Sequence, residues 1–80
     1  MKLRVHFRDR HAGRWETHDV EASQIPTVGE YLAPAPVKVF RVVMTLHVLF
    51  RADYDAEVFA ELVDFERVQR DSLGGVVWKA

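Results

Sequence analysis

One uninterrupted alternation limits what this chain can fold into. The stretch 37–51 reads VKVFRVVMTLHVLFR and consists mostly of β-branched, aromatic and other apolar residues. Successive side chains of a strand point to opposite sides, so one face of this stretch would be wholly apolar: Phe40, Val42, Met44, Leu46, Val48 and Phe50. The other face is half polar. The pattern predicts a long strand whose apolar face is covered by the rest of the chain.

Length and composition define the class of protein. Eighty residues allow one small domain, residues 1–80, with a modest core. The sequence contains no cysteine, so no disulfide or thiolate-bound metal can stabilise that core. No apolar run reaches the roughly 20 residues needed to span a bilayer, and the first ten residues do not resemble a signal peptide. We therefore expect a cytoplasmic protein that does not contact a membrane.

The first 20 residues predict a β-hairpin. Residues 2–8 place apolar and basic side chains on opposite faces, and residues 14–20 form the second strand. A four-residue loop at 10–13 would end in Gly13, which can adopt the positive φ that such loops require. This register sets oppositely charged or stacking residues across from each other: Lys2 and Glu21, Arg4 and Asp19, and Arg8 and Trp15.

The middle of the chain is rich in loops. Residues 25–32 predict a short strand entered through a turn at Pro26, and Gly29 would permit a kink. Residues 33–36 contain two prolines, so they form either a connector or an edge.

The segment 56–68 shows two periodicities. A helix over 56–70 is supported by Asp53 or Asp55 as its N-cap and by Gly74-Gly75 as its end. A strand is supported by the alternation of Val58, Ala60 and Leu62 and by the polar turn that precedes it. Residues 67–80 form either a C-terminal extension or an edge strand, in which we expect Trp78 to pack against the domain.

The order of these parts resembles a known class of small proteins. An N-terminal hairpin is followed by Pro26-Thr27-Val28-Gly29-Glu30, by Phe40-Arg41-Val42-Val43 and by Asp55-Ala56-Glu57-Val58-Phe59. This order is similar to that of small uncharacterised bacterial and phage proteins that look like SH3-type five-stranded barrels. The resemblance covers residues 2–66 and implies a mostly β fold, a small SH3-like antiparallel barrel of about five strands. It favours a strand at 56–65, although an α+β fold with a helix over 56–70 stays open. It also implies an accessory protein of a mobile element.

Charge is distributed unevenly along the chain. Residues 1–51 contain eight Lys or Arg and five Asp or Glu, whereas residues 52–80 contain three and seven. Such asymmetry can mark a basic binding face or an acidic surface. It can equally reflect two complementary halves that lie beside each other.

Enzymatic chemistry has little support in the sequence. The four histidines show no metal-ligand spacing, and neither Ser23 nor Ser72 lies in the context of a catalytic nucleophile. No phosphate-binding glycine loop is present either. We therefore expect a protein that is not an enzyme and that uses no metal and no cofactor.

The function predicted by elimination is a protein-interaction module. Its acidic segment could bind a basic surface of another protein, as a phage inhibitor of a host complex would. The candidate partner-binding residues combine acids with aromatic anchors: Tyr54, Asp55, Glu57, Phe59, Glu61 and Trp78. A homodimer formed through an exposed strand or through residues 76–78 is a further hypothesis.

The alternative function is the binding of RNA or single-stranded nucleic acid. Small barrels bind such ligands by stacking bases on aromatic side chains within a basic groove. The candidate residues lie mostly in the N-terminal half: Arg8, Arg10, Arg14, Trp15, Arg41 and Arg51. The sequence pI of about 6.4 argues against this alternative, because nucleic-acid-binding domains are usually basic.

Overall fold

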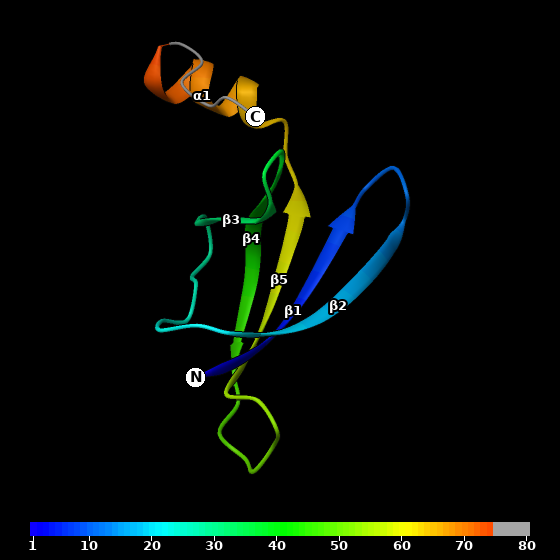
Figure 1. The fold of residues 1–80 in the computed structure, drawn as a ribbon, viewed down its shortest axis with the longest axis vertical. Coiled ribbons are helices and arrows are strands. Elements are labelled where there is room, and N and C mark those ends of the chain that lie inside the picture. The colour runs from blue at the N-terminus through cyan, green and yellow to red at the C-terminus, as the bar shows by residue number, and fades with distance from the viewer. Residues whose placement is uncertain (75–80) are drawn as a thin grey trace.

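A computed structural model of the protein, which describes residues 1–74, contains one five-stranded sheet and one short helix (Figure 1). In chain order the elements are β1 (Lys2–Asp9), β2 (Arg14–Glu21), β3 (Tyr31–Ala35), β4 (Lys38–His47), β5 (Ala56–Leu62) and α1 (Phe65–Leu73). The sheet order is β2-β1-β5-β4-β3, and the sheet curls into a half-barrel. The predicted mostly β fold of about five strands is confirmed.

One strand pair departs from the predicted antiparallel arrangement. Strands β1 and β5 run parallel, with Leu3 opposite Ala56 and Val5 opposite Val58, while the other three pairs are antiparallel. The direction follows from the connection 48–55, which returns the chain to the end of the sheet where β1 begins. There, the Asp55 N–H donates to the Lys2 carbonyl at 2.7 Å.

The hairpin of β1 and β2 has the register that the sequence predicts. Lys2 lies opposite Glu21, Arg4 opposite Asp19 and Arg8 opposite Trp15. Gly13 closes the loop at a φ of 72°, which only glycine adopts without strain. Charge and turn chemistry within 20 residues were sufficient to specify this unit.

The core is small and lies on the inner, concave side of the half-barrel. Alternate residues of β1 and β5 meet there, and Val42 of β4 is fully buried beside them. The cluster consists of Leu3, Val5, Phe7, Phe40, Val42, Ala56, Val58 and Ala60. The loop residues Ala22 and Ile25, with Leu32 and Leu62, cover its margins.

Strand β4 corrects the prediction of a continuous apolar inner face. A β-bulge sets both Val43 and Met44 near Phe59, so the alternation shifts by one residue after Val42. Thr45 then faces the core side opposite Val58, and its hydroxyl donates to the Pro26 carbonyl at 2.6 Å. Met44 and Leu46 consequently lie on the outer face, about half exposed.

The strand also ends earlier than predicted. Residues 48–55 form a loop at the end of the sheet opposite α1 (Figure 1), and its Leu49 and Phe50 are 95% and 72% exposed. The predicted covering of Phe50 is therefore wrong.

The segment before β4 differs from its prediction in position. Residues 22–30 form a loop, and the strand occupies Tyr31–Ala35 with Pro34 inside it. Pro34 is tolerated there because β3 is an edge strand and its register with β4 is irregular between Leu32 and Ala35. Gly29 has a φ of 95°, and the Glu30 carboxylate closes the turn by accepting from the Thr27 N–H and hydroxyl.

The ambiguous segment 56–68 contains both predicted elements in succession. Residues 56–62 form β5, and α1 follows after Asp64, whose side chain caps the helix by accepting from the Arg67 N–H. Asp53 and Asp55 are therefore not the cap. The helix ends at Gly74, in the left-handed conformation, as its sequence predicts. Residues 67–73 belong to this helix and not to an edge strand; residues 76–78 lie outside the described part of the chain.

Two leucines provide a test of the core. Leu3 is 1% exposed, so Leu3→Ala should lower the free energy of unfolding by about 2–5 kcal/mol, measured by urea denaturation. The matched control Leu49→Ala removes a side chain that is 95% exposed and should change it by less than about 0.5 kcal/mol. Equal effects of the two substitutions would contradict the assignment of the core.

Candidate functional site

The outer, convex face of the sheet carries most of the residues that the sequence singled out. Basic β1 lies directly beside acidic β5, so Arg4 is opposite Glu57 and Arg8 is opposite Glu61. Antiparallel β2 adds Trp15 and Asp19 on the other side of β1. Arg10 of the hairpin loop contacts Glu61, and Tyr54 of the 48–55 loop contacts Arg4. We call these residues together the outer-face network: Arg4, His6, Arg8, Arg10, Trp15, Thr17, Asp19, Tyr54, Glu57, Phe59 and Glu61.

The Glu61 carboxylate forms ion pairs with two arginines of the first hairpin, Arg8 and Arg10. Arg8 donates to Glu61 Oε2, and Arg10 donates to both carboxylate oxygens at 3.0 and 3.3 Å. The Glu61 side chain is only 12% exposed. The hydrogen bonds from Arg10 and Arg8 lower the pKa of this carboxyl, and the same contact raises the pKa of Arg10.

Arg4 joins β1 to β2 and to the loop before β5. Its guanidinium donates to both oxygens of Asp19, at 3.0 and 3.2 Å, and lies 4.4 Å from the centre of the Tyr54 ring. The hydrogen bond from Arg4 lowers the pKa of Asp19. A two-pronged contact of this kind is more geometrically specific than a single ion pair.

His6 and Trp15 complete the outer-face network through their rings. His6 bonds to Thr17 Oγ1 at 2.8 Å and to Glu57 Oε1 at 2.9 Å, and it stacks on Phe59 with ring centroids 4.5 Å apart. Trp15 meets Phe59 edge-on at 5.7 Å, and the Arg8 guanidinium lies 4.5 Å above the indole ring. The expected stacking of Arg8 on Trp15 is therefore present.

The two predicted binding sites thus form one surface in which they partner each other. Of the proposed acids, Glu57 and Glu61 bind cations or imidazole of β1 and its loop, and Asp55 accepts from the Lys2 N–H at 2.9 Å. The uneven charge of the sequence reflects two halves that lie side by side. Arg41 of β4 lies opposite Glu61, on the side of β5 away from β1. The other candidates are dispersed: Arg14 lies at the end of β2 that follows the hairpin loop, Arg51 lies in the 48–55 loop, and Trp78 lies outside the described residues.

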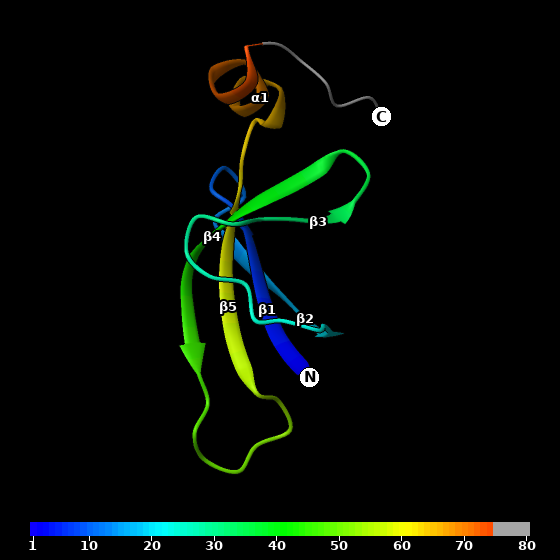
Figure 2. The ribbon, with the colours of Figure 1, turned by 90° about the vertical axis from the view of Figure 1, so that its left-hand side faces the viewer.

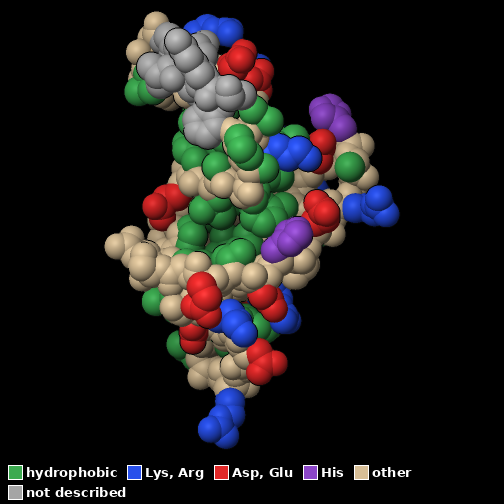
Figure 3. Space-filling model, in the orientation of Figure 1, with side chains coloured by type: hydrophobic (Ala, Val, Ile, Leu, Met, Phe, Trp, Pro, Cys, Tyr) green, Lys and Arg blue, Asp and Glu red, His purple; other side chains and the backbone are tan. Residues whose placement is uncertain are grey.

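The inner side of the half-barrel holds a groove that the sequence did not predict. The face seen in Figure 3 has hydrophobic side chains at its centre, in the space between β2 and β3 of Figure 1. Two adjoining cavities of about 410 and 480 Å³ lie there and share Phe7, Glu16, Lys38 and Phe40. The rings of Phe7 and Phe40, 4.7 Å apart, form its floor.

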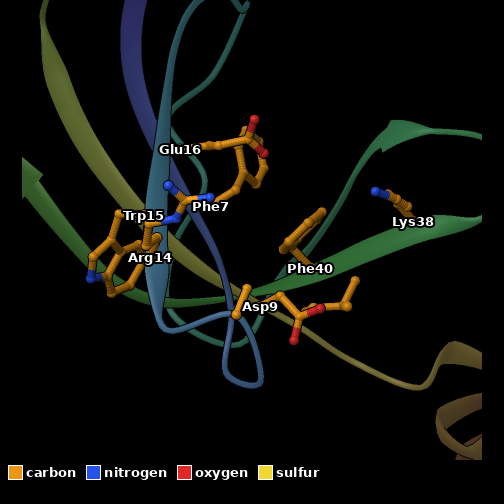
Figure 4. Close-up of a pocket in the computed structure, with 9 residues that line it drawn as sticks. Phe7, Asp9, Arg14, Trp15, Glu16, Lys38 and Phe40 are labelled. Carbon is orange, nitrogen blue, oxygen red and sulfur yellow. The ribbon is translucent and has the colours of Figure 1, made fainter.

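Charged side chains of both signs line this groove. Figure 4 shows Glu16 beside the Phe7 ring and Lys38 on the far side of Phe40, with Arg14 closer to the hairpin loop. Among the described residues, Arg14, Glu16 and Lys38 take part in no ion pair, unlike the charges of the outer-face network. These three groups are therefore available to a ligand.

No group of three or more His, Asp or Glu within residues 1–74 is arranged to hold a metal ion. Within the same residues, no helix has the length and apolar character needed to cross a bilayer.

Comparison with known proteins adds no assignment. The chain matches no family model, no curated protein and no solved structure. Any function must therefore be argued from the two surfaces described above.

The outer-face network predicts a specific pH dependence of stability. Because the folded-state pKa of Glu61 is lowered, its contribution is complete above the ordinary glutamate value of 4.5 and is lost as pH falls through the lower folded value. Glu61→Gln should therefore lower the free energy of unfolding by about 1 kcal/mol at neutral pH, and the deficit should shrink in acid.

Urea denaturation at several pH values measures this deficit. Glu16→Gln is the matched control, since Glu16 forms no ion pair among the described residues, and it should show little deficit at any pH. A deficit for Glu61→Gln that stays constant from neutral to acidic pH would rule out the charge-based explanation.

Proposed function

We propose that the protein is a non-enzymatic protein-interaction module that binds a segment of a partner protein in the groove between β2 and β3. The observation that carries the proposal is the contrast between the two surfaces. Charges on the outer face are largely paired internally, whereas the groove combines an apolar floor with Arg14, Glu16 and Lys38, which form no ion pair within residues 1–74.

The pairing on the outer face shifts the proposed site away from the acidic surface. A basic partner would have to displace Arg8 and Arg10 from Glu61 and the His6 ring from Glu57. Each displacement would leave a charged or polar group in need of a new partner, which makes exchange at such contacts close to neutral in free energy. The groove requires no such exchange.

The groove also indicates the chemistry of its ligand. Phe7 and Phe40 offer aromatic surface, while Arg14 and Lys38 provide positive charge and Glu16 provides negative charge. Concave sites with an apolar floor and a few convergent polar groups are typical binding sites. The ligand we propose is an extended protein segment that carries an aromatic or aliphatic anchor and charged residues of both signs.

The biological setting is proposed from the resemblance alone. The order of hairpin, Pro26–Glu30 turn and central strand supports a role as an accessory or inhibitor protein of a phage or other mobile element. A groove that binds one segment of a host protein would suit that role, since occupation of a surface suffices for inhibition.

Selection of peptides tests the groove directly. Peptides enriched from a random display library should carry an apolar anchor and should shift the amide NMR signals of β2, β3 and the start of β4. Val20 is 39% exposed and lines the groove, so Val20→Asp should weaken binding by at least about tenfold.

The control substitution lies outside the groove. Val43 is 40% exposed and lies at the bulge of β4, so Val43→Asp should leave peptide affinity unchanged. Peptides that shift the signals of Glu57 and Glu61, and whose binding depends on either residue, would instead support the acidic surface.

The nucleic-acid alternative is favoured by one observation. The groove carries Arg14 and Lys38, and Trp15, 41% exposed, lies at its border with its ring on the outer face against Arg8 and Phe59. A base that stacks on Trp15 could therefore place its phosphate near cations at the border of the groove. This alternative predicts that a single-stranded oligonucleotide binds with an affinity that falls steeply with salt, measured by fluorescence anisotropy. It also predicts that Arg14→Gln with Lys38→Gln abolishes that binding. Salt-independent or undetectable binding would contradict it.

A further inference from the structure

We propose that the second half of β4 is a self-association edge, through which two copies of the chain pair antiparallel about Leu46. This inference does not rest on the groove, because the groove is formed by β1, β2 and the hairpin loop between them, by β3, and by the start of β4 and the end of β5, and not by the second half of β4.

Within residues 1–74, the distal half of β4 has no paired strand on one side, where the 22–30 loop reaches it only through the hydrogen bond from the Thr45 hydroxyl to the Pro26 carbonyl. Strand β3 pairs with β4 only as far as Arg41, and the last backbone hydrogen bonds on that side join Val42 to Gly29 and Glu30. Beyond Val42, β5 is the only neighbouring strand among the described residues, as Figure 2 shows. The sheet therefore has a third edge, in addition to those of β2 and β3.

The backbone groups at this edge can be identified. The Val48 N–H donates to the Asp55 carbonyl, so the backbone N–H and carbonyl of Val48 point toward β5. Because these groups alternate in direction along a strand, those of Leu46 point toward β5 as well. Thr45 and His47 must then point theirs outward. Thr45 and His47, two residues apart, each therefore present one N–H group and one carbonyl at this edge.

The side chains at this edge do not protect it. Exposed edges are usually blunted by charged residues or proline. The other two edges follow that rule, with four charged residues in β2 and Pro34 in β3. From Val42 to Phe50, however, there is no Lys, Arg, Asp, Glu or Pro. Met44 and Leu46, 48% and 49% exposed, extend this apolar surface toward Leu49 and Phe50.

A second copy fits this edge because the edge complements itself. In this register Leu46 lies opposite Leu46 of the second copy. Thr45 then lies opposite His47 of the second copy, and His47 lies opposite its Thr45. Both outward residues then exchange backbone hydrogen bonds, which other registers do not allow. The stretch carries no Lys, Arg, Asp or Glu, so like charges do not oppose the pairing. A two-fold arrangement of this kind closes as a dimer.

Sedimentation of the full chain over a range of concentrations tests the dimer. We expect a monomer–dimer equilibrium in which Leu46→Lys raises the dissociation constant at least about tenfold. Leu73→Lys, at the exposed end of α1, and Val20→Asp, in the groove, should leave it unchanged. A monomer at every concentration, or a dimer dissolved by Val20→Asp and insensitive to Leu46→Lys, overturns the proposal.

Single cysteines test the register in a chain that has none of its own. Leu46→Cys places two sulfur atoms across the two-fold axis at a separation that a disulfide spans, and should form a covalent dimer under mild oxidation. Met44→Cys has the same exposure, but the two Met44 positions are four residues out of register, so it should stay monomeric. Cross-linking of Met44→Cys that equals or exceeds that of Leu46→Cys overturns the proposal.

Discussion

The parallel pairing of β1 with β5 is the contact on which the rest of the structure depends. Without it the sheet would consist of a separate two-stranded hairpin, β1–β2, and a three-stranded unit, β3–β4–β5, and an isolated two-stranded hairpin is marginally stable in water. The register between β1 and β5 aligns residues on both faces of the sheet. Val5 lies beside Val58 in the core, and Arg8 lies beside Glu61 on the outer face. The basic and acidic halves of the sequence are thereby brought together.

The parts of the fold that were predictable depend on local signals. The first hairpin, its register and the role of Gly13 followed from charge pairs and turn chemistry within 20 residues. The parallel neighbour of β1 did not, because nothing in a strand's own alternation specifies which distant strand it joins. The bulge at Val43 was missed for a related reason: counting every second residue assumes a regular ladder, which one extra residue interrupts.

The candidate site was predictable as a set of residues but not as an arrangement. The acids and arginines singled out from the sequence lie largely on one face, where they bind each other. The groove was missed although β2 offers a clue to it. Its inner face carries Arg14, Glu16 and His18, which a strand buried on that side would not have. Segment 56–68 showed both periodicities because β5 gives way to α1 at Asp64.

The long separation between β1 and β5 has a consequence for how the chain folds. The hairpins β1–β2 and β4–β5 join residues close in sequence, whereas Arg8 and Glu61 are 53 residues apart. Contacts at such separation form late, because ordering the intervening chain costs entropy before any contact repays it. Until the two hairpins dock, the inner edges of β1 and β5 are both unpaired. We therefore expect the docking of the hairpins, and not the formation of strands, to determine how long a newly made chain is exposed to aggregation.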